Sequence, residues 1–385
     1  MKKRRGTVIA GGGTGGHVVP SLQIARALVG LGHDPQSIEF FGSRRGQEAT
    51  IWPALEFPFT LLPGRGIRRS LRPAALWANA GAALGLLWAT IRSAASFAAR
   101  RPRVVVVVGG YAGLPAGLAA VLTRVPVVLM NTDAVPGAVN GLLGRFAAAS
   151  AVAFPGTDLP RSHVTGTPVR PELASLDRTA TGRQEARTML GLPAQRRTLA
   201  AVGGSLGARR INAAVADLAH RWSDREEVSV YHVAGRRDYE EFALPADQAG
   251  HPAAGLPAEA GAALHYQVVP FEERMPELYR AADLYVGRAG AMSVAELLMA
   301  GVPAILVPLP GAPRDHQTRN AQAMVAAGAA ILIPDAECSA ARLAAELDSL
   351  LPDTARLAAM GAAARELAHP DAAVRVAELV DAHAR

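Results

Sequence analysis

A glycine-rich turn lies between a short apolar run and a helical pattern in each half of the chain. The first turn spans Gly11–Gly16 and is followed by His17, and the second spans Gly203–Gly207. A strand that ends in glycines and leads into a helix points backbone N–H groups and the positive end of the helix dipole at whatever lies above the turn. Each half is therefore predicted to carry an anion site. A cleft between the halves would hold a phosphorylated donor and a second substrate.

Short β-branched runs alternate with longer helical patterns along the whole chain. The five consecutive valines Val104–Val108 fit a strand that is buried on both faces. Strands are predicted at residues 7–10, 37–41, 103–108, 125–129 and 151–154, and again at 198–202, 228–233, 283–286, 304–307 and 330–333. This alternation predicts an α/β protein of two tandem doubly wound, Rossmann-like domains with a deep cleft between them.

The chain has 385 residues, which is too long for one ordinary core and favours two domains. Glycine and proline interrupt the pattern at Thr165–Pro168. We therefore expect an N-terminal domain at residues 1–166, a C-terminal domain at 167–350, and terminal helices at 351–385 that can return to the N-terminal domain.

The net charge of +7 invites an anionic partner. Nearly all of the basic residues are arginines, however, and no aromatic platform accompanies them, so we expect no nucleic-acid partner. The apolar stretch that follows the basic start is too short for an export signal. The sequence contains no P-loop lysine, no His-Glu-x-x-His helix and no Asp-x-Asp pair, so neither a metal nor a cofactor is expected.

Gly11, Gly13 and Gly16 also satisfy the dinucleotide-binding pattern G-x-G-x-x-G. A nicotinamide-dependent oxidoreductase is therefore one alternative. Such an enzyme needs an acidic residue after the next strand to bind a ribose. Only Glu39 is near, and it lies inside the predicted strand.

A third informative segment, Gly287–Glu296, follows the predicted strand 283–286. Ser293 and Glu296 have the spacing of a capping box, in which each side chain satisfies a free N–H at the start of a helix. The alternative is that Glu296 binds the two hydroxyls of a ribose at the mouth of the sheet. The role of His17 also has two interpretations. It is either a proton acceptor near a helix start or a histidine that hydrogen-bonds a neighbouring loop.

Four motifs together resemble the MurG family of UDP-N-acetylglucosamine transferases, which convert lipid I to lipid II. They are Gly-Gly-Thr-Gly-Gly-His at residues 12–17, Gly-Gly-Ser-x-Gly-Ala at 203–208, Arg-Ala-Gly-Ala at 288–291 with Glu296, and Asp-His-Gln at 315–317 with Asn320. They occur in the family's order and spacing from Thr7 to about Ala330. The resemblance implies a B-type glycosyltransferase fold. It also implies an inverting transfer to the C4 hydroxyl of the muramic sugar of lipid I.

The resemblance also implies roles for residues and partners. On the acceptor side, Thr14, Gly15 and Gly16 would face the acceptor. On the donor side, Ser205 and Arg170 would bind the diphosphate and nucleotide, Glu296 would bind the ribose, backbone near Phe271 and Glu272 would recognise uracil, and Gln317 would bind the transferred sugar. The diphosphate would be lined by Ala291, Met292, Ser293, Val294 and Ala295. The implied partners are UDP-N-acetylglucosamine, lipid I, and other proteins of cell-wall synthesis, cell division and cell shape. His17 is the expected base, with helix N-termini and Arg170 stabilising the departing diphosphate.

The sequence departs from the family after the predicted strand 125–129. Where the family usually has His-Glu-Gln-Asn, this chain reads Met130-Asn131-Thr132-Asp133. We expect Asn131 and Asp133 to contact the acceptor, with Asp133 as a second catalytic residue that accepts the proton or orients the attacking hydroxyl. The alternatives are that Asp133 only shapes the turn before Pro136, or that the chain is a non-catalytic UDP-sugar-binding subunit.

Residues 73–91 contain no charge and are flanked by arginines. A spanning helix is one interpretation, although Pro73, Asn79 and Thr90 interrupt the run. An apolar patch rimmed by arginines favours docking on an anionic membrane surface instead. A third interpretation is an ordinary buried helix. The patch is predicted to comprise Arg68, Arg69, Arg72, Trp77, Leu84 and Trp88, which makes this a peripheral protein on the cytoplasmic face of the cell membrane.

Overall fold

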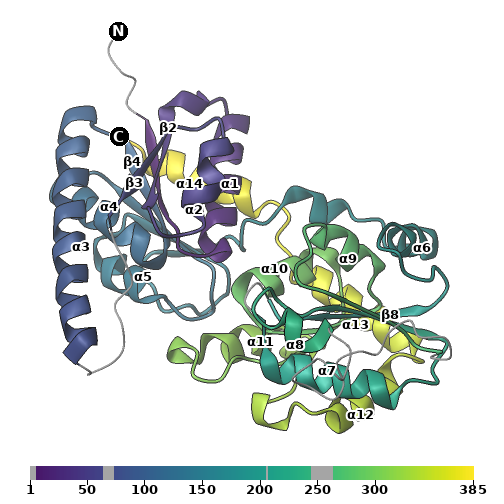
Figure 1. Ribbon diagram of the computed structural model, residues 1–385. Helices are drawn as coiled ribbons and strands as arrows, with labels where there is room; N and C mark the ends of the chain where they lie inside the picture. Colours follow the sequence, from purple (N-terminus) through teal and green to yellow (C-terminus); the bar gives the residue numbers. More distant parts are fainter. Residues whose placement is uncertain (1–5, 64–72, 205–206, 244–262) are drawn as a thin grey trace. The chain divides into compact units, whose positions relative to one another are not determined.

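The computed structural model describes residues 6–63, 73–204, 207–243 and 263–385. These residues form two compact units: the chain up to Arg170 together with His369–Arg385, and Pro171–Ala368. The sequence placed boundaries after residues 166 and 350, whereas the packing divides the chain after 170 and again after 368. Each unit holds one sheet in which every described strand pairing is parallel (Figure 1), so the prediction of two tandem α/β units is confirmed.

Within the described ranges, the sheet of the first unit has the strand order β3-β2-β1-β4-β5-β6-β7. Its strands are β1 (Thr7–Gly11), β2 (Ile38–Ser43), β3 (Phe59–Leu62), β4 (Val104–Gly109), β5 (Val127–Asn131), β6 (Ala149–Val152) and β7 (Ser162–Val164). Its helices are α1 (Gly15–Gly30), α2 (Glu48–Ile51), α3 (Pro73–Arg100), α4 (Gly110–Leu122), α5 (Ala138–Leu143) and α14 (Ala372–His383).

The predicted strands of this unit occur close to their expected positions. Two strands are shifted: β5 begins and ends two residues after the predicted range 125–129, and β6 begins and ends two residues before the predicted range 151–154. The edge strands β3 and β7 were not predicted. Their side chains are largely half-buried or exposed, so they lack the continuous apolar pattern of the central strands.

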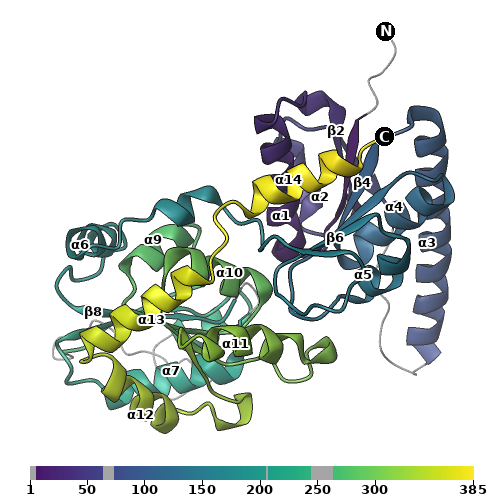
Figure 2. The same ribbon diagram turned by 180° about the vertical axis from the view of Figure 1, so that it is seen from behind.

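The valines of β4 carry the core of the first unit on both faces of its sheet. Val104, Val106 and Val108 belong to one buried cluster, and Val105 and Val107 belong to another. Successive side chains of a strand point to opposite faces, so a run of valines supplies apolar contacts to both helical layers. Helices α1 and α14 cover the first face, and α3 and α4 pack on the second (Figures 1 and 2).

The last helix joins the first unit although the chain reaches it from the second. Val376, Ala377 and Val380 of α14 are fully buried in the same cluster as the even-numbered valines of β4. Figure 2 shows α14 lying beside α1. The preceding helix α13 (Thr354–Glu366) packs instead against α10 (Ala291–Ala300) of the second unit.

The described strands of the second unit have the order β10-β9-β8-β11-β12-β13. They are β8 (Arg197–Val202), β9 (Val228–Val233), β10 (His265–Val269), β11 (Leu284–Gly287), β12 (Ala304–Leu306) and β13 (Ala330–Leu332). The remaining helices are α6 (Ala180–Met189), α7 (Arg209–Arg221), α8 (Tyr239–Ala243), α9 (Met275–Ala281), α11 (His316–Ala326) and α12 (Ala340–Leu350). The edge strand β10 was not predicted, and all its side chains are half-buried.

A buried carboxylate anchors the start of β11. Asp283 accepts hydrogen bonds from the Arg187 guanidinium of α6 at 2.8 Å and from the Thr198 N–H of β8 at 2.8 Å. Removing one partner of such a pair leaves an uncompensated buried charge. Asp283 therefore fixes α6 and the strand pair β8–β11, whose other ends carry the site segments.

Candidate active site

The glycine-rich turns lie at the carboxyl ends of the central strands of the two sheets. In the first unit the strand order reverses between β1 and β4, and in the second between β8 and β11. Ligands of doubly wound sheets bind at the carboxyl edge where the order reverses. The turns that follow β1 and β8 therefore occupy the expected ligand-binding position of each unit.

A buried carboxylate that the sequence analysis did not single out braces the first turn. Glu48 is fully buried, and its two carboxylate oxygens accept hydrogen bonds from the Gly13 N–H at 2.7 Å and the Ser43 N–H at 2.9 Å. A Cβ on Gly12, whose φ is +147°, would lie 2.3 Å from this carboxylate. No periodicity marks Glu48, because its role is set by one contact with a turn 35 residues away.

Glu48 also defines which N–H groups of the turn can meet a ligand. It takes the Gly13 N–H, and the Thr14 carbonyl takes the N–H of His17. The N–H groups of Thr14, Gly15 and Gly16 make no hydrogen bond to an acceptor in the described part of the chain. These are the residues expected to face the acceptor, and they begin α1, where the helix dipole favours an anion.

His17 lies in the first turn of α1 with its ring against the end of β4. A Cβ on Gly109 would lie 3.1 Å from His17 Nε2, and a Cβ on Gly110 would lie 3.2 Å from Nδ1. Both glycines have a positive φ, +113° and +70°. A Cβ on Gly110 would also lie 2.3 Å from the Gly12 carbonyl oxygen. The two glycines therefore permit the close approach of the imidazole to the backbone.

The surroundings of His17 keep its ring neutral. Burial lowers the pKa of His17, against the opposing effects of the Asp133 and Glu48 carboxylates and a hydrogen bond with the Gly12 backbone. Desolvation is the largest cause of this lowering of the pKa. A neutral imidazole near carboxylates is suited to accept a proton.

The turn after β5 separates the roles of Asn131 and Asp133. Asn131 is 3% exposed, donates to the Asp133 carbonyl at 2.6 Å, and accepts from the Gly137 N–H at 3.1 Å and from Asn140 at 3.2 Å. Asn131 thus shapes the turn, the role that we had considered for Asp133. Asp133 is half-buried and close enough to raise the pKa of His17. The structure therefore brings together His17 and Asp133, the two expected catalytic residues.

In the second unit, the turn after β8 passes close to neighbouring polar groups. A Cβ on Gly203 would lie 2.8 Å from Asn212 Oδ1, and one on Gly207, whose φ is +89°, would lie 2.4 Å from Asp238 Oδ2. Glycine is therefore required at both positions. Ser205, the residue expected at the diphosphate, lies outside the described residues.

The capping box predicted for Ser293 and Glu296 is wrong. Helix α10 begins at Ala291 with Gly290 as its N-cap, so these two side chains lie too far along the helix to cap it. Glu296 is 8% exposed and accepts a hydrogen bond from the Tyr279 hydroxyl at 2.9 Å, while Ser293 hydrogen-bonds Tyr285. The hydrogen bond from the Tyr279 hydroxyl therefore holds the Glu296 carboxylate in position.

The other expected donor residues differ in how they are held. Ala291, Met292, Ser293 and Ala295 are half-buried along the start of α10, whereas the Val294 side chain is fully buried. Glu272 is 6% exposed and turns inward, accepting from the Tyr231 hydroxyl and from the Arg274 N–H at 2.7 Å.

Gln317 and Arg170 complete the expected donor set. Gln317 accepts from the Leu309 N–H at 2.9 Å, and Arg170 is the last residue of the first unit before the division. Among the described residues, no three His, Cys, Asp or Glu side chains form a group that could hold a metal ion.

Comparisons with known proteins match both halves of the chain. The glycosyltransferase family 28 N-terminal domain matches residues 7–152, within the first unit, and the family's C-terminal domain matches residues 198–376. A protein of Alkalilimnicola ehrlichii is 40% identical to this chain, covering 98% of it and 99% of its own length. Its name is UDP-N-acetylglucosamine--N-acetylmuramyl-(pentapeptide) pyrophosphoryl-undecaprenol N-acetylglucosamine transferase.

A protein of the same name from a Nocardioides species is 38% identical and covers 97% of this chain and 96% of its own length. Among solved structures, the crystal structure of Acinetobacter baumannii MurG is similar to this one with a TM-score of 0.74 and 28% identity. It covers 98% of this chain and 100% of its own. The similarity therefore extends over both units.

Proposed function

The chain belongs to glycosyltransferase family 28, and we propose that it transfers N-acetylglucosamine from UDP-N-acetylglucosamine to lipid I, which forms lipid II. Its fold is the B type of glycosyltransferase fold. The observation that carries the catalytic assignment is the proximity of His17 to Asp133 at the carboxyl edge of the first sheet. The acceptor sugar's hydroxyl would be activated at this edge.

The oxidoreductase alternative is disfavoured by the surroundings of Glu39. Such an enzyme needs an acidic side chain that is available to a ribose. Glu39 lies within β2, accepts a hydrogen bond from Thr60 at 2.9 Å, and forms an ion pair with Arg100. Its carboxylate is thus engaged by the fold.

The transfer is an inverting displacement. The acceptor hydroxyl oxygen forms a bond to the anomeric carbon while the bond from that carbon to the diphosphate breaks, and UDP leaves. The hydroxyl proton passes to His17, whose ring is neutral before the reaction. Asp133 stabilises the imidazolium that forms, because a nearby carboxylate favours the charged ring.

The donor belongs to the second unit. Glu296, held by Tyr279, accepts hydrogen bonds from the ribose hydroxyls, and the start of α10 lies along the diphosphate. Ser205 and Arg170 bind the leaving group, as in the family, and the N-terminus of a helix favours the negative charge that develops there. Gln317 contacts the transferred sugar.

The membrane contact belongs to α3. Leu84, Leu87, Trp88 and Ile91 are 69%, 57%, 51% and 59% exposed and form one stripe at helical spacing. The Arg92 guanidinium lies over the Trp88 ring at 5.3 Å. Trp77, Arg68, Arg69 and Arg72, which we also predicted to be in this patch, lie outside the residues whose side chains the structure describes.

Residues 79–100 of α3 are long and apolar enough to cross a membrane by length and composition alone. The opposite face of the helix is buried in the first unit, where Ala89 and Phe97 join the core. A helix with one face in a protein core and an exposed apolar stripe favours surface docking over spanning. We propose that the protein is peripheral and docks on the cytoplasmic face of the membrane.

A direct transfer assay tests the proposed function and the base together. The wild-type chain should transfer N-acetylglucosamine from the UDP-sugar to a lipid I analogue. His17→Ala should lower turnover by about a hundredfold or more while the affinity for UDP is retained, since a positioned base contributes about this much. His163→Ala, which changes an exposed histidine in β7 of the same unit, is the matched control. Turnover of His17→Ala within a few fold of wild type would assign the base to another residue, and donor binding without any transfer by wild type would identify a non-catalytic subunit.

The donor assignment is tested by comparing Glu296→Gln with Tyr279→Phe. Losing a hydrogen bond to a charged group costs about 1.5–3 kcal/mol. Glu296→Gln should therefore weaken UDP binding by about tenfold or more in calorimetric titration. Tyr279→Phe removes the internal hydrogen bond to Glu296 and leaves its carboxylate in place, so its main effect should be a lower melting temperature. Unchanged UDP affinity in Glu296→Gln would mean that Glu296 serves only to anchor Tyr279.

The membrane assignment is tested with vesicles of phosphatidylglycerol and phosphatidylcholine. Replacing Leu84, Trp88 and Ile91 by serine should abolish sedimentation with the vesicles and leave the melting temperature nearly unchanged, because these side chains are exposed. Leu122→Ser is the control, since Leu122 is 71% exposed and is the last residue of α4, a different helix from the one that carries the stripe. Vesicle binding by the folded triple variant would exclude the stripe as the anchor, and resistance of wild type to extraction by carbonate would indicate a spanning helix.

A further inference from the structure

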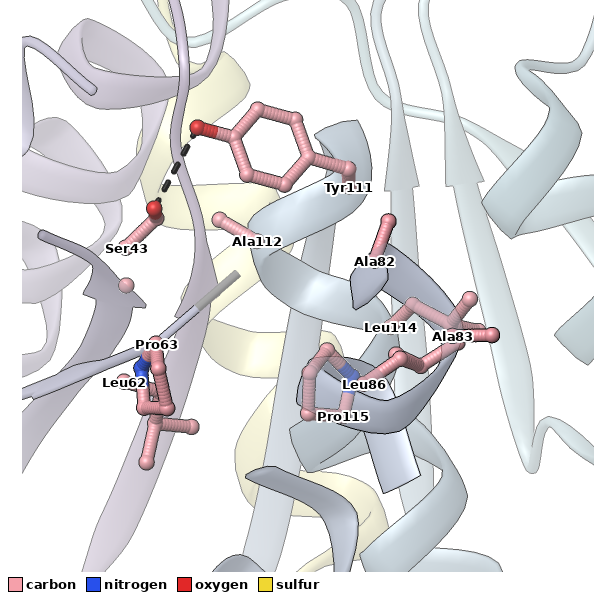
Figure 3. A pocket seen from close by; sticks show the side chains of 11 residues that line it. Ser43, Leu62, Pro63, Ala82, Ala83, Leu86, Tyr111, Ala112, Leu114 and Pro115 are labelled. Atoms are coloured by element: carbon pink, nitrogen blue, oxygen red, sulfur yellow. Dashed lines mark hydrogen bonds between the residues drawn. The ribbon is translucent and has the colours of Figure 1, made fainter. Parts of the chain in front are cut away.

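The first unit contains a cavity of ≈ 120 Å³ that the transfer reaction described above does not use. It lies between the facing sides of α3 and α4 and beside the ends of β2 and β3 (Figure 3). Its walls are almost entirely apolar and include Leu62, Ala82, Leu86, Leu114 and Pro115. A cavity of this character favours hydrocarbon over a polar ligand.

One end of the cavity adjoins the glycine-rich turn through Tyr111. The Tyr111 hydroxyl donates to Ser43 Oγ at 3.2 Å, so these two hydroxyl groups bond to each other at the wall (Figure 3). A Cβ on Gly13 would lie 3.3 Å from the Tyr111 ring. A single aromatic ring therefore separates the cavity from the turn whose N–H groups are expected to face the acceptor.

The other end of the cavity adjoins the exposed stripe of α3. Ala83 lines the cavity and is itself exposed, and Leu87 of the stripe follows it by one helical turn. The cavity thus lies between an anion-binding turn and the apolar surface that meets the membrane. Within the acceptor, the first isoprene units lie between the diphosphate and the membrane-embedded remainder of the chain.

We propose that this cavity receives the first isoprene unit of the polyprenyl diphosphate acceptor. The inference rests on the proposed function, because it takes the lipid-linked acceptor as given. A cavity of ≈ 120 Å³ has the size of cavities that hold one small apolar group such as a benzene ring, and a five-carbon isoprene unit is of that size. Tyr111 contacts the chain where it leaves the diphosphate, and Leu86 and Leu114 enclose the branched carbons.

The proposal is tested with two water-soluble lipid I analogues that differ only in their lipid, one farnesyl and one butyl, in detergent-free buffer without vesicles. Wild type should use the farnesyl analogue with the higher kcat/KM, because burial of apolar surface favours it. Ala83→Phe, which fills the cavity from its open side, should lower the ratio of the two kcat/KM values by about tenfold. Ala80→Phe adds the same ring to an exposed position of α3 that does not line the cavity, and should keep the wild-type ratio.

A second measurement keeps the proposal testable if Ala83→Phe does not fold. A prenyl diphosphate carrying a diazirine on its first isoprene unit should label wild-type peptides that contain residues 82–86 or 111–115 after irradiation. An unchanged ratio in folded Ala83→Phe, or labelling confined to other peptides, would overturn the proposal. Failure of wild type to transfer to either analogue would instead refute the proposed function, so the two failures are distinguishable.

Discussion

The close approach of His17 to the backbone of Gly109 and Gly110 is the constraint on which the rest of the site depends. A side chain at Gly110 would collide with the Gly12 carbonyl, and side chains at either glycine would press on the imidazole. With hydrogen atoms there instead, the half-buried ring lies at the reversal point of the sheet. Burial then keeps the ring neutral, and Asp133 provides the negative charge that makes protonation accessible.

Each unit carries features that suit the chemistry of one of the two substrates. The first unit combines the neutral imidazole of His17 with three features suited to a lipid-linked anion: the N-terminus of α1, the apolar cavity and the exposed stripe of α3. The second unit presents helix α10 and the buried carboxylate of Glu296, which suit a nucleotide. Glu48 links the first set, because it binds both the turn at Gly13 and the end of β2 at Ser43, which Tyr111 contacts.

Local sequence patterns were sufficient for the central strands and for the positions of the two glycine-rich turns. The valines of β4 are an example: a continuous apolar run is unambiguous when both faces are covered. The edge strands β3, β7 and β10 were missed because half-buried strands lack that signal. The role of Glu48 and the contact of Tyr279 with Glu296 depend on residues that are distant in sequence. The role of Asn131 depends on the form of the turn that it stabilises. The pattern Ser293-x-x-Glu296 was misleading because a capping box requires the serine to be the N-cap, and the N-cap of α10 is Gly290, three residues earlier.

The central claim, that burial holds His17 neutral while Asp133 favours its protonation, is tested most directly by an NMR titration of the His17 ring nitrogens. The account predicts a pKa below the ordinary value of 6.5 in wild type, and a still lower pKa in Asp133→Asn, because the substitution removes a carboxylate that raises it. A wild-type pKa above 6.5, or one that Asp133→Asn leaves unchanged, would contradict the account.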